Sequence, residues 1–404
     1  MKSSLTQVSG FRAIGVACGL KLSGNPDLAL IVADRMCTTA AVFTTNQFKA
    51  APVLYDQALL KETQGHLQGV IINAGNANAV TGEQGLRDAA EMARLTEMAC
   101  NLPPQSVFVM STGVIGHRLP LDKVTNGIQT AAKKIITPDG AQGHLAAQAI
   151  MTTDLVPKEA FTQTTIGGQI INIGGMCKGS GMIHPNMATM LALIVTDATI
   201  APAPLDLALR TAVEVSFNAI TVDGDTSTND TLVILASGQL PDSPLNNTNS
   251  VEFRQFCHAL TEVCISLAKA VARDGEGATK LVEITVNGAL TQAEAKRAAK
   301  AIANSPLVKT ALFGNDPNWG RVLAAVGYSG ITVDPARTSL KLGHLPLVYL
   351  GEPLDFDAVA AHDWLAQQHE ITLTVELGLG AATATVWTCD FSYKYVEINA
   401  EYHT

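Results

Sequence analysis

Short runs of apolar residues alternate with longer stretches in which apolar positions recur every three or four residues. Three of the short runs, at 70–72, 107–110 and 190–195, predict buried strands. Each run stops at a polar residue: Asn73 follows the first, and Ser111 follows the second. Taken alone, the Ser111-Thr112-Gly113 segment after the second run is typical of an ordinary turn that ends a strand.

Helical periodicity governs the longer stretches. The longest covers 251–273, where Phe253, Leu260 and Leu267 fall on one face and Gly275 lies just beyond the end. The helices predicted before residue 280 are 86–100, 121–136, 204–217 and 251–273.

The final third of the chain has a different pattern. Residues 281–286 alternate as in a strand, which indicates a smaller α+β unit over 281–404. The later elements predicted there are a helix at 292–303, a strand at 321–326, a helix at 356–368, and strands at 370–377 and 382–388. Few βαβ patterns occur, so we expect an α+β fold: a layered α/β sandwich whose mixed sheets enclose the site, plus this smaller C-terminal domain.

Composition narrows the classes of function. The 404 residues are 47% hydrophobic and carry a net charge of −9 without long charged runs, which argues against nucleic acid or an anionic membrane as partner. No apolar run follows the first residues as in a signal peptide, and no run is long enough to span a membrane. The seven cysteines form no ligand-spaced cluster and predict free thiols in a cytoplasmic protein.

A glycine-rich segment at 174–191 carries the densest chemical signal. Its order Lys178-Gly179-Ser180 is wrong for a phosphate-binding Walker A loop, which needs Gly-Lys followed by Ser or Thr. A plain structural alternative is a crossover that feeds the buried strand at 190–195.

This segment and several others resemble the ornithine acetyltransferase (glutamate N-acetyltransferase) family. The matching motifs occur in family order across nearly the whole chain: Ala51-Pro52-Val53, Asn73–Asn78, Ser111–Gly116, Thr152-Thr153-Asp154, Lys178–Leu191, Asp223–Asp230, Asp274–Lys280, Asp316–Arg321 and Glu397–Ala400. The resemblance implies self-cleavage between Ala188 and Thr189. It would yield an alpha fragment, 1–188, and a beta fragment, 189–404, in which 189–280 completes the main catalytic domain and 281–404 forms the smaller one.

The implied chemistry requires this cut. A threonine hydroxyl needs a base, and the α-amino group that cleavage would give Thr189 titrates near about 7.7–8.0. In the resemblance, Thr189 attacks the acetyl group of N2-acetylornithine, ornithine leaves, and glutamate takes the acetyl group in a ping-pong reaction of arginine biosynthesis.

The resemblance also assigns site residues. It implies an oxyanion hole from Thr112 and Gly113, and Lys178 as the cation for the substrates' α-carboxylate. The residues it implies for substrate binding are Thr152, Lys178, Thr189, Glu276, Asn399 and Thr404. It implies no cofactor or metal, with acetyl-CoA as an alternative acetyl donor, and a heterotetramer of two alpha and two beta fragments. The alternating Asp223, Asp225, Ser227 and Asn229 lack the glycine and final carboxylate of a calcium loop, so a polar turn near the site is expected.

Two other functions fit the sequence. A self-processed N-terminal-nucleophile amidohydrolase or aminopeptidase would use the same nucleophile but pass the acyl group to water. A non-enzymatic small-ligand-binding protein would leave the 42.4 kDa chain uncut.

Overall fold

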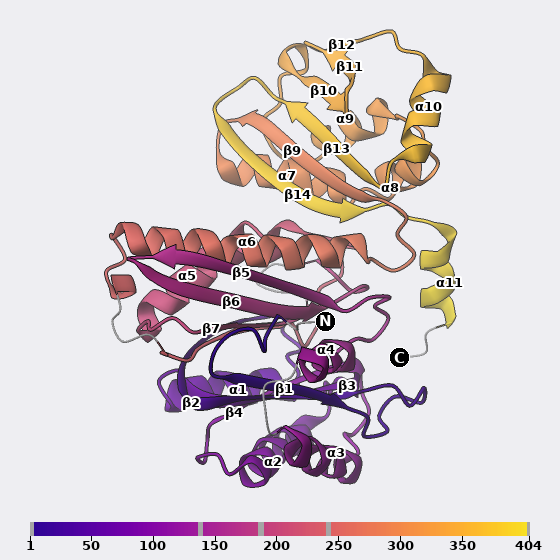
Figure 1. Cartoon of the computed structure of the whole chain (residues 1–404). Helices are drawn as coiled ribbons and strands as arrows, with labels where there is room; N and C mark the ends of the chain where they lie inside the picture. Colours follow the sequence, from indigo (N-terminus) through magenta and orange to yellow (C-terminus); the bar gives the residue numbers. More distant parts are fainter. Residues whose placement is uncertain (1–3, 136–139, 185–189, 240–243, 402–404) are drawn as a thin grey trace.

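One long strand joins the two halves of the main sheet in the computed structural model, which describes residues 4–135, 140–184, 190–239 and 244–401. This strand is β2 (Leu28–Phe43), and the sheet runs in the order β4-β3-β2-β8-β7-β6-β5, with β1 paired to β2. The first part of β2 pairs with β3, its last part pairs with β8, and the register is irregular between Val32 and Cys37. The sheet therefore folds into two layers, seen one above the other in Figure 1. Its other strands are β1 (Phe11–Val16), β3 (His66–Asn76), β4 (Val107–Val114), β5 (Lys158–Ile166), β6 (Gln169–Lys178), β7 (Leu191–Thr196) and β8 (Thr231–Ala236).

Apolar side chains fill the space between these two layers. Phe108 and Ile72 from one layer share a buried cluster with Leu193 and Leu235 from the other. Helices cover the outer faces: α2 and α3 pack beside β1–β4, and α5 and α6 pack on β5–β8 (Figure 1). The helical segments of this part of the chain are α1 (Ala51–Glu62), α2 (Gly82–Cys100), α3 (Leu121–Lys134), α4 (Gly140–Ala149), α5 (Pro202–Glu214), η1 (Phe217–Ala219), η2 (Pro244–Asn246) and α6 (Val251–Arg273).

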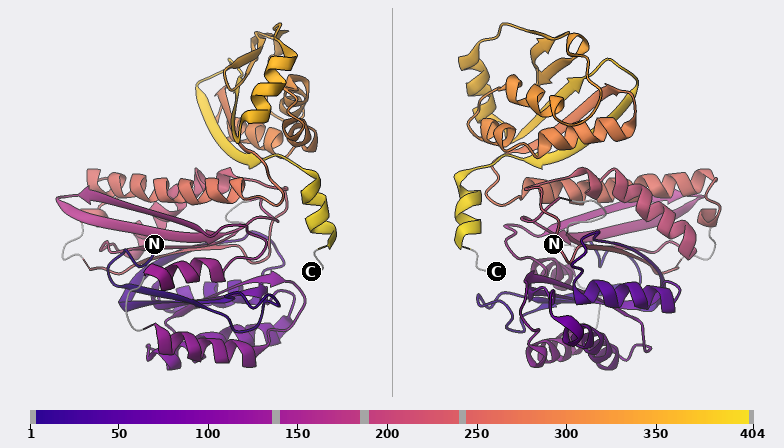
Figure 2. Two further views of the ribbon diagram at one scale, coloured as in Figure 1. Left: turned by 45° about the vertical axis from the view of Figure 1, so that its right-hand side comes forward. Right: turned by 180° about the vertical axis from the view of Figure 1, so that it is seen from behind.

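A second mixed sheet, in the order β12-β11-β10-β13-β9-β14, has its own apolar core. Its last helix, α11, leaves this unit and returns alongside the main one (Figure 2). The elements from residue 281 onward are β9 (Leu281–Ala289), α7 (Gln292–Ala303), α8 (Pro306–Phe313), α9 (Trp319–Gly327), η3 (Pro335–Arg337), β10 (Ser339–Leu342), β11 (Leu345–Tyr349), β12 (Glu352–Pro353), α10 (Ala358–Gln367), β13 (Glu370–Glu376), β14 (Ala382–Cys389) and α11 (Tyr393–Glu401).

The predicted fold class is confirmed: the chain is an α+β protein with a layered α/β sandwich of mixed strands and a smaller α+β unit. The strand predicted at 321–326 is wrong, because this segment lies in helix α9. The side chain of Asn318 caps the helix by accepting a hydrogen bond from the Arg321 amide at 3.1 Å. Val322, Ala325 and Val326 are buried at helical spacing, a pattern that a short apolar run can hide.

The sequence predicted no membrane-spanning segment and predicted free cysteine thiols. No helix within the described ranges is long and apolar enough to cross a membrane. All seven cysteines carry free thiols.

Candidate active site

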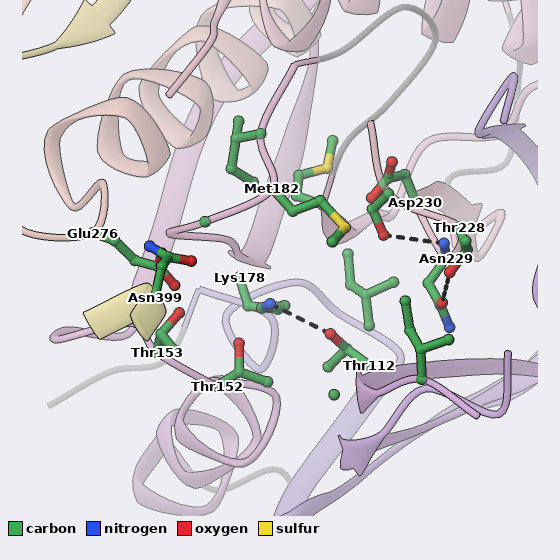
Figure 3. A pocket seen from close by; sticks show the side chains of 17 residues that line it. Thr112, Thr152, Thr153, Lys178, Met182, Thr228, Asn229, Asp230, Glu276 and Asn399 are labelled. Carbon is green, nitrogen blue, oxygen red and sulfur yellow. Dashed lines mark hydrogen bonds between the residues drawn. The ribbon is translucent and has the colours of Figure 1, made fainter. Parts of the chain in front are cut away.

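A pocket of about 230 Å³ lies at the ends of β4 and β6, beside residues 227–230, which directly precede β8. It brings together six residues predicted for the site from far-apart parts of the chain (Figure 3): Thr112, Gly113, Thr152, Lys178, Glu276 and Asn399. Ala188, Thr189 and Thr404 lie outside the described residues. Met190, which follows Thr189 in the chain, lines the pocket.

The end of β4 carries Thr112 and Gly113. Gly113 has φ +130°, and a Cβ built there would lie 2.4 Å from the carbonyl carbon of Gly75. Only glycine fits this conformation and this close approach of β3, so the backbone here cannot accept a larger residue.

Amide side chains fix this strand end from behind. Asn229 Nδ2 donates to the carbonyl oxygens of Ser111, at 2.8 Å, and Ala77, at 2.6 Å. The Ser111 hydroxyl in turn donates to Asn73 Oδ1 at 2.6 Å. The polar residues that follow the two predicted strands therefore form one buried network, which holds Thr112 in place.

Lys178 is the cation of the pocket. It ends β6, is buried, and its Nζ donates to Thr112 Oγ1 at 3.4 Å. Burial lowers the pKa of Lys178, and the nearby Asp154 carboxylate opposes that shift. An ammonium at this position can stabilise an anionic group beside the Thr112 hydroxyl.

Asp154 holds two walls of the pocket together. Its carboxylate accepts hydrogen bonds from the backbone N–H of Thr152, at 2.9 Å, and of Gly179, at 2.7 Å. Burial would raise its pKa, but the charges of Lys178 and Lys158 outweigh this effect and lower the pKa to about 2.

Lys158 links Asp154 to Asp274, on a third segment of the pocket's surroundings. Its Nζ lies 2.6 Å from the carboxylates of both Asp154 and Asp274, and the two acids hold its pKa above the ordinary value despite burial. Asp274 follows α6, and its carbonyl oxygen accepts from the Ser180 hydroxyl at 2.6 Å. The segments around Thr152, Lys178 and Asp274 are thus fixed by one set of charges. Nothing in the local sequence pattern marks Lys158 as a functional residue, so its part in the site was not predicted.

Glu276 and Asn399 form the opposite end of the pocket. Asn399, on α11, donates from Nδ2 to Glu276 Oε2 at 2.8 Å. Gly181 leaves the space for this carboxylate, because a Cβ there would lie 2.4 Å from Glu276 Cδ. Helix α11 therefore brings a residue near the end of the chain to the same pocket as β4 and β6 (Figure 3).

The acidic turn that follows η1 binds backbone groups. The Asp223 carboxylate accepts from the amides of Met182, at 2.6 Å, and Ile183, at 2.8 Å, and burial raises its pKa. Across the described part of the chain, no three His, Cys, Asp or Glu side chains gather as metal ligands. Through these two hydrogen bonds the turn holds the backbone of the glycine-rich segment.

Comparisons with known proteins cover almost the whole sequence. A model of the ArgJ family matches residues 12–404. The arginine biosynthesis bifunctional protein ArgJ of Symbiobacterium thermophilum is 50% identical over 100% of this chain and 99% of its own length. The protein of the same name from Thermosynechococcus vestitus is 46% identical over 99% of this chain and 98% of the relative. The crystal structure of ArgJ from Bacillus halodurans is 42% identical, covers 51% of this chain and 96% of that chain, and has a TM-score of 0.48.

Proposed function

Because the chain belongs to the ArgJ family, we propose that it transfers the acetyl group of N2-acetylornithine to glutamate, giving ornithine and N-acetylglutamate. The observation that carries this proposal is the meeting of six motif residues from separate segments in one pocket beside Met190. The two relatives described above are named for arginine biosynthesis, which agrees with the proposed reaction.

In the proposed mechanism the chain cuts itself between Ala188 and Thr189, so that Thr189 gains a free amine. The amine takes the hydroxyl proton, and the oxygen attacks the acetyl carbonyl. Thr112 Oγ1 and the Gly113 N–H stabilise the oxyanion. The proton passes to the departing nitrogen of ornithine, and an acetyl ester of Thr189 remains. Glutamate then attacks this ester through its amine and regenerates the hydroxyl.

Substrate binding in this proposal uses the rest of the pocket. Lys178 pairs with the α-carboxylate that both amino acids share. Thr152, Glu276 and Asn399 contact the remaining polar groups, and Thr404 joins them from the end of the chain. No step requires a metal or cofactor.

Processing and acyl transfer are tested together. Under denaturing conditions the wild type should show fragments of 188 and 216 residues (404 − 188 = 216) instead of one 42.4 kDa chain. N-terminal sequencing of the 216-residue fragment should read Thr-Met-Leu-Ala, and the Thr189→Ala variant should remain one uncut chain. An uncut wild type would favour the ligand-binding alternative, and efficient cleavage of Thr189→Ala would refute the nucleophile.

The second measurement separates transfer from hydrolysis. N2-acetylornithine alone should add one acetyl group to the fragment that begins at Thr189, and glutamate should remove it. Release of acetate at the same rate with and without glutamate would instead support an amidohydrolase.

Three further parts complete the proposal: the assembly follows from the resemblance, the compartment from the cysteine pattern, and the ranking of acetyl donors from the charges in the sequence. The enzyme assembles from two alpha and two beta fragments, and it works in the cytoplasm. Acetyl-CoA is a weaker acetyl donor than N2-acetylornithine, because no basic cluster in the sequence suits its pyrophosphate. Equal kcat/KM values for the two donors would refute this ranking.

A further inference from the structure

Asp230 is a pocket residue to which neither the motifs nor the proposed mechanism gives a task. It stands directly before β8, is 2% exposed, and lines the pocket. Its backbone is fixed: its carbonyl oxygen accepts from the Thr44 amide at 2.9 Å, and the next amide, of Thr231, donates to Met190 O at 2.9 Å. In Figure 3 it lies across the pocket from Glu276 and Asn399, with Lys178 between.

One oxygen of this carboxyl group is unsatisfied. Asp230 Oδ2 is buried and has no hydrogen-bond partner within the described residues, while Ser227 hydrogen-bonds to the carboxyl group. Burial raises the pKa of Asp230 well above its ordinary value, and Lys178 only partly opposes the shift. A buried carboxyl group with one unsatisfied oxygen is costly, so its presence in a ligand pocket indicates a partner for that oxygen that arrives during function.

In its ionised form the carboxylate only accepts hydrogen bonds, so a partner that holds it in that form must donate them, and a cationic donor suits it best. An ammonium would satisfy Oδ2 and stabilise the ionised form. The Lys178 ammonium does not fill this place, because Asp230 Oδ2 has no hydrogen-bond partner within the described residues and Lys178 Nζ donates to Thr112 Oγ1 instead.

We propose that the Asp230 carboxylate binds an ammonium group that enters this pocket during the reaction. The inference rests on the proposed acetyl transfer, which offers two sources of such a group. One is the α-amino group that cleavage gives to Thr189, the chain neighbour of Met190. The other is the side-chain ammonium of the ornithine substrate.

The test is Asp230→Asn, which keeps the shape of the side chain and removes its charge. The matched control is Asp56→Asn. Asp56 is also fully buried with an unpartnered Oδ2 and a raised pKa, but it lies on α1, outside the pocket, and accepts from the Val109 amide. Both variants should fold with melting temperatures equal to or above the wild type at pH 7. A large drop for Asp230→Asn alone would show that the carboxylate already has a structural partner and would overturn the proposal.

The kinetics use two acetyl donors on processed enzyme. N2-acetylornithine carries an ammonium, whereas N-acetylglutamate, the donor of the reverse reaction, carries none. In a ping-pong reaction, kcat/KM for each donor reports only its own half-reaction. Asp230→Asn should lose about 10–100-fold in kcat/KM, the effect of one hydrogen bond to a charged group, while Asp56→Asn should stay within twofold of wild type.

The two sources give different results. Equal loss with both donors identifies the α-amino group of the chain, and loss confined to N2-acetylornithine identifies the substrate ammonium. Wild-type kcat/KM with both donors would overturn the proposal, as would a folded Asp230→Asn chain that fails to cleave, because Asp230 would then act before any amine exists. Failure of the wild type to exchange acetyl groups would instead refute the proposed function.

Discussion

Replacing Asp154 with asparagine should weaken both the fold and substrate binding, because this carboxylate holds two pocket walls and faces two lysines. Asn keeps the size of the side chain but loses the charge that pairs with Lys158 Nζ at 2.6 Å. It also leaves Lys178 without the carboxylate that most strongly favours its charged form.

The magnitude follows from the pKa. Lowering the pKa of Asp154 from 3.8 to about 2 corresponds to about 2.4 kcal/mol in favour of the ionised form. Breaking one side of a buried ion pair costs about 3–5 kcal/mol, because the remaining charge stays buried. We expect the lower end of this range, about 3 kcal/mol, because Lys158 is almost fully buried but keeps its pairing with Asp274 at 2.6 Å. It should appear as a loss of about 3–4 °C in melting temperature, because unfolding 404 residues carries an entropy of about 0.85 kcal/mol/K.

The sign of the pH dependence provides a second check. The folded-state pKa is depressed, so the stabilisation is complete above the unfolded value of 3.8 and is lost as the pH falls through about 2. The difference in stability between wild type and Asp154→Asn should therefore be constant near neutral pH and should narrow as the pH falls through this window.

The control is Asp206→Asn. It removes an ion pair of similar length, 2.8 Å to Arg210, with both side chains more than 40% exposed. Exposed pairs contribute about 0–1 kcal/mol, so melting should barely change. On the processed enzyme, Asp154→Asn should also raise the KM for N2-acetylornithine and move the alkaline limb of activity to lower pH, because the pKa of Lys178 falls further. Equal, small melting shifts in the two variants would refute the stability argument.

Two other changes test the walls of the pocket. Thr112→Ala should lower turnover of the processed enzyme by about 10²–10³-fold if its hydroxyl is a principal oxyanion donor, and near-normal turnover would remove Thr112 from that role. Gly181→Ala should lower kcat/KM by about 10²-fold, because its Cβ would meet the Glu276 carboxyl carbon at 2.4 Å and displace the partner of Asn399. Gly327→Ala is the matched control, since nothing lies within 4 Å of its added Cβ. Equal activity of the two glycine variants would show that the Glu276 position does not matter.

Local patterns predicted much of the fold, because most elements have a clear period. The face of α6 was predicted correctly through Phe253, Leu260 and Leu267, all of which are buried. The error at α9 arose because a run of nine residues is too short to distinguish a helical period from a strand period. The capping side chain of Asn318 favours the helix. The irregular pairing of β2 between Val32 and Cys37, which folds the sheet into two layers, has no periodic signal.

The candidate site was less accessible to local reasoning. Local pattern placed Thr112 and Gly113 only at the end of a strand, and Asn399 lies 123 residues from its partner Glu276, near the end of the chain. Only the family motifs placed such residues in one site. The motifs also contain Asp154 and Asp274, yet nothing local indicates that Lys158 joins them, because a buried ion cluster depends on long-range packing.

The strand that follows the proposed cleavage bond is held by its neighbours on both sides. β7 is fully buried and pairs with β6 on one side and β8 on the other. The Thr231 amide also bonds to Met190 O, one residue before the strand begins. Unfolding this strand would break hydrogen bonds on both sides and expose its apolar side chains, so its position does not depend on the peptide bond before Thr189. The hydrogen bonds that hold β7 and Met190 would therefore survive the proposed cut, and Met190 would keep its place in the pocket wall.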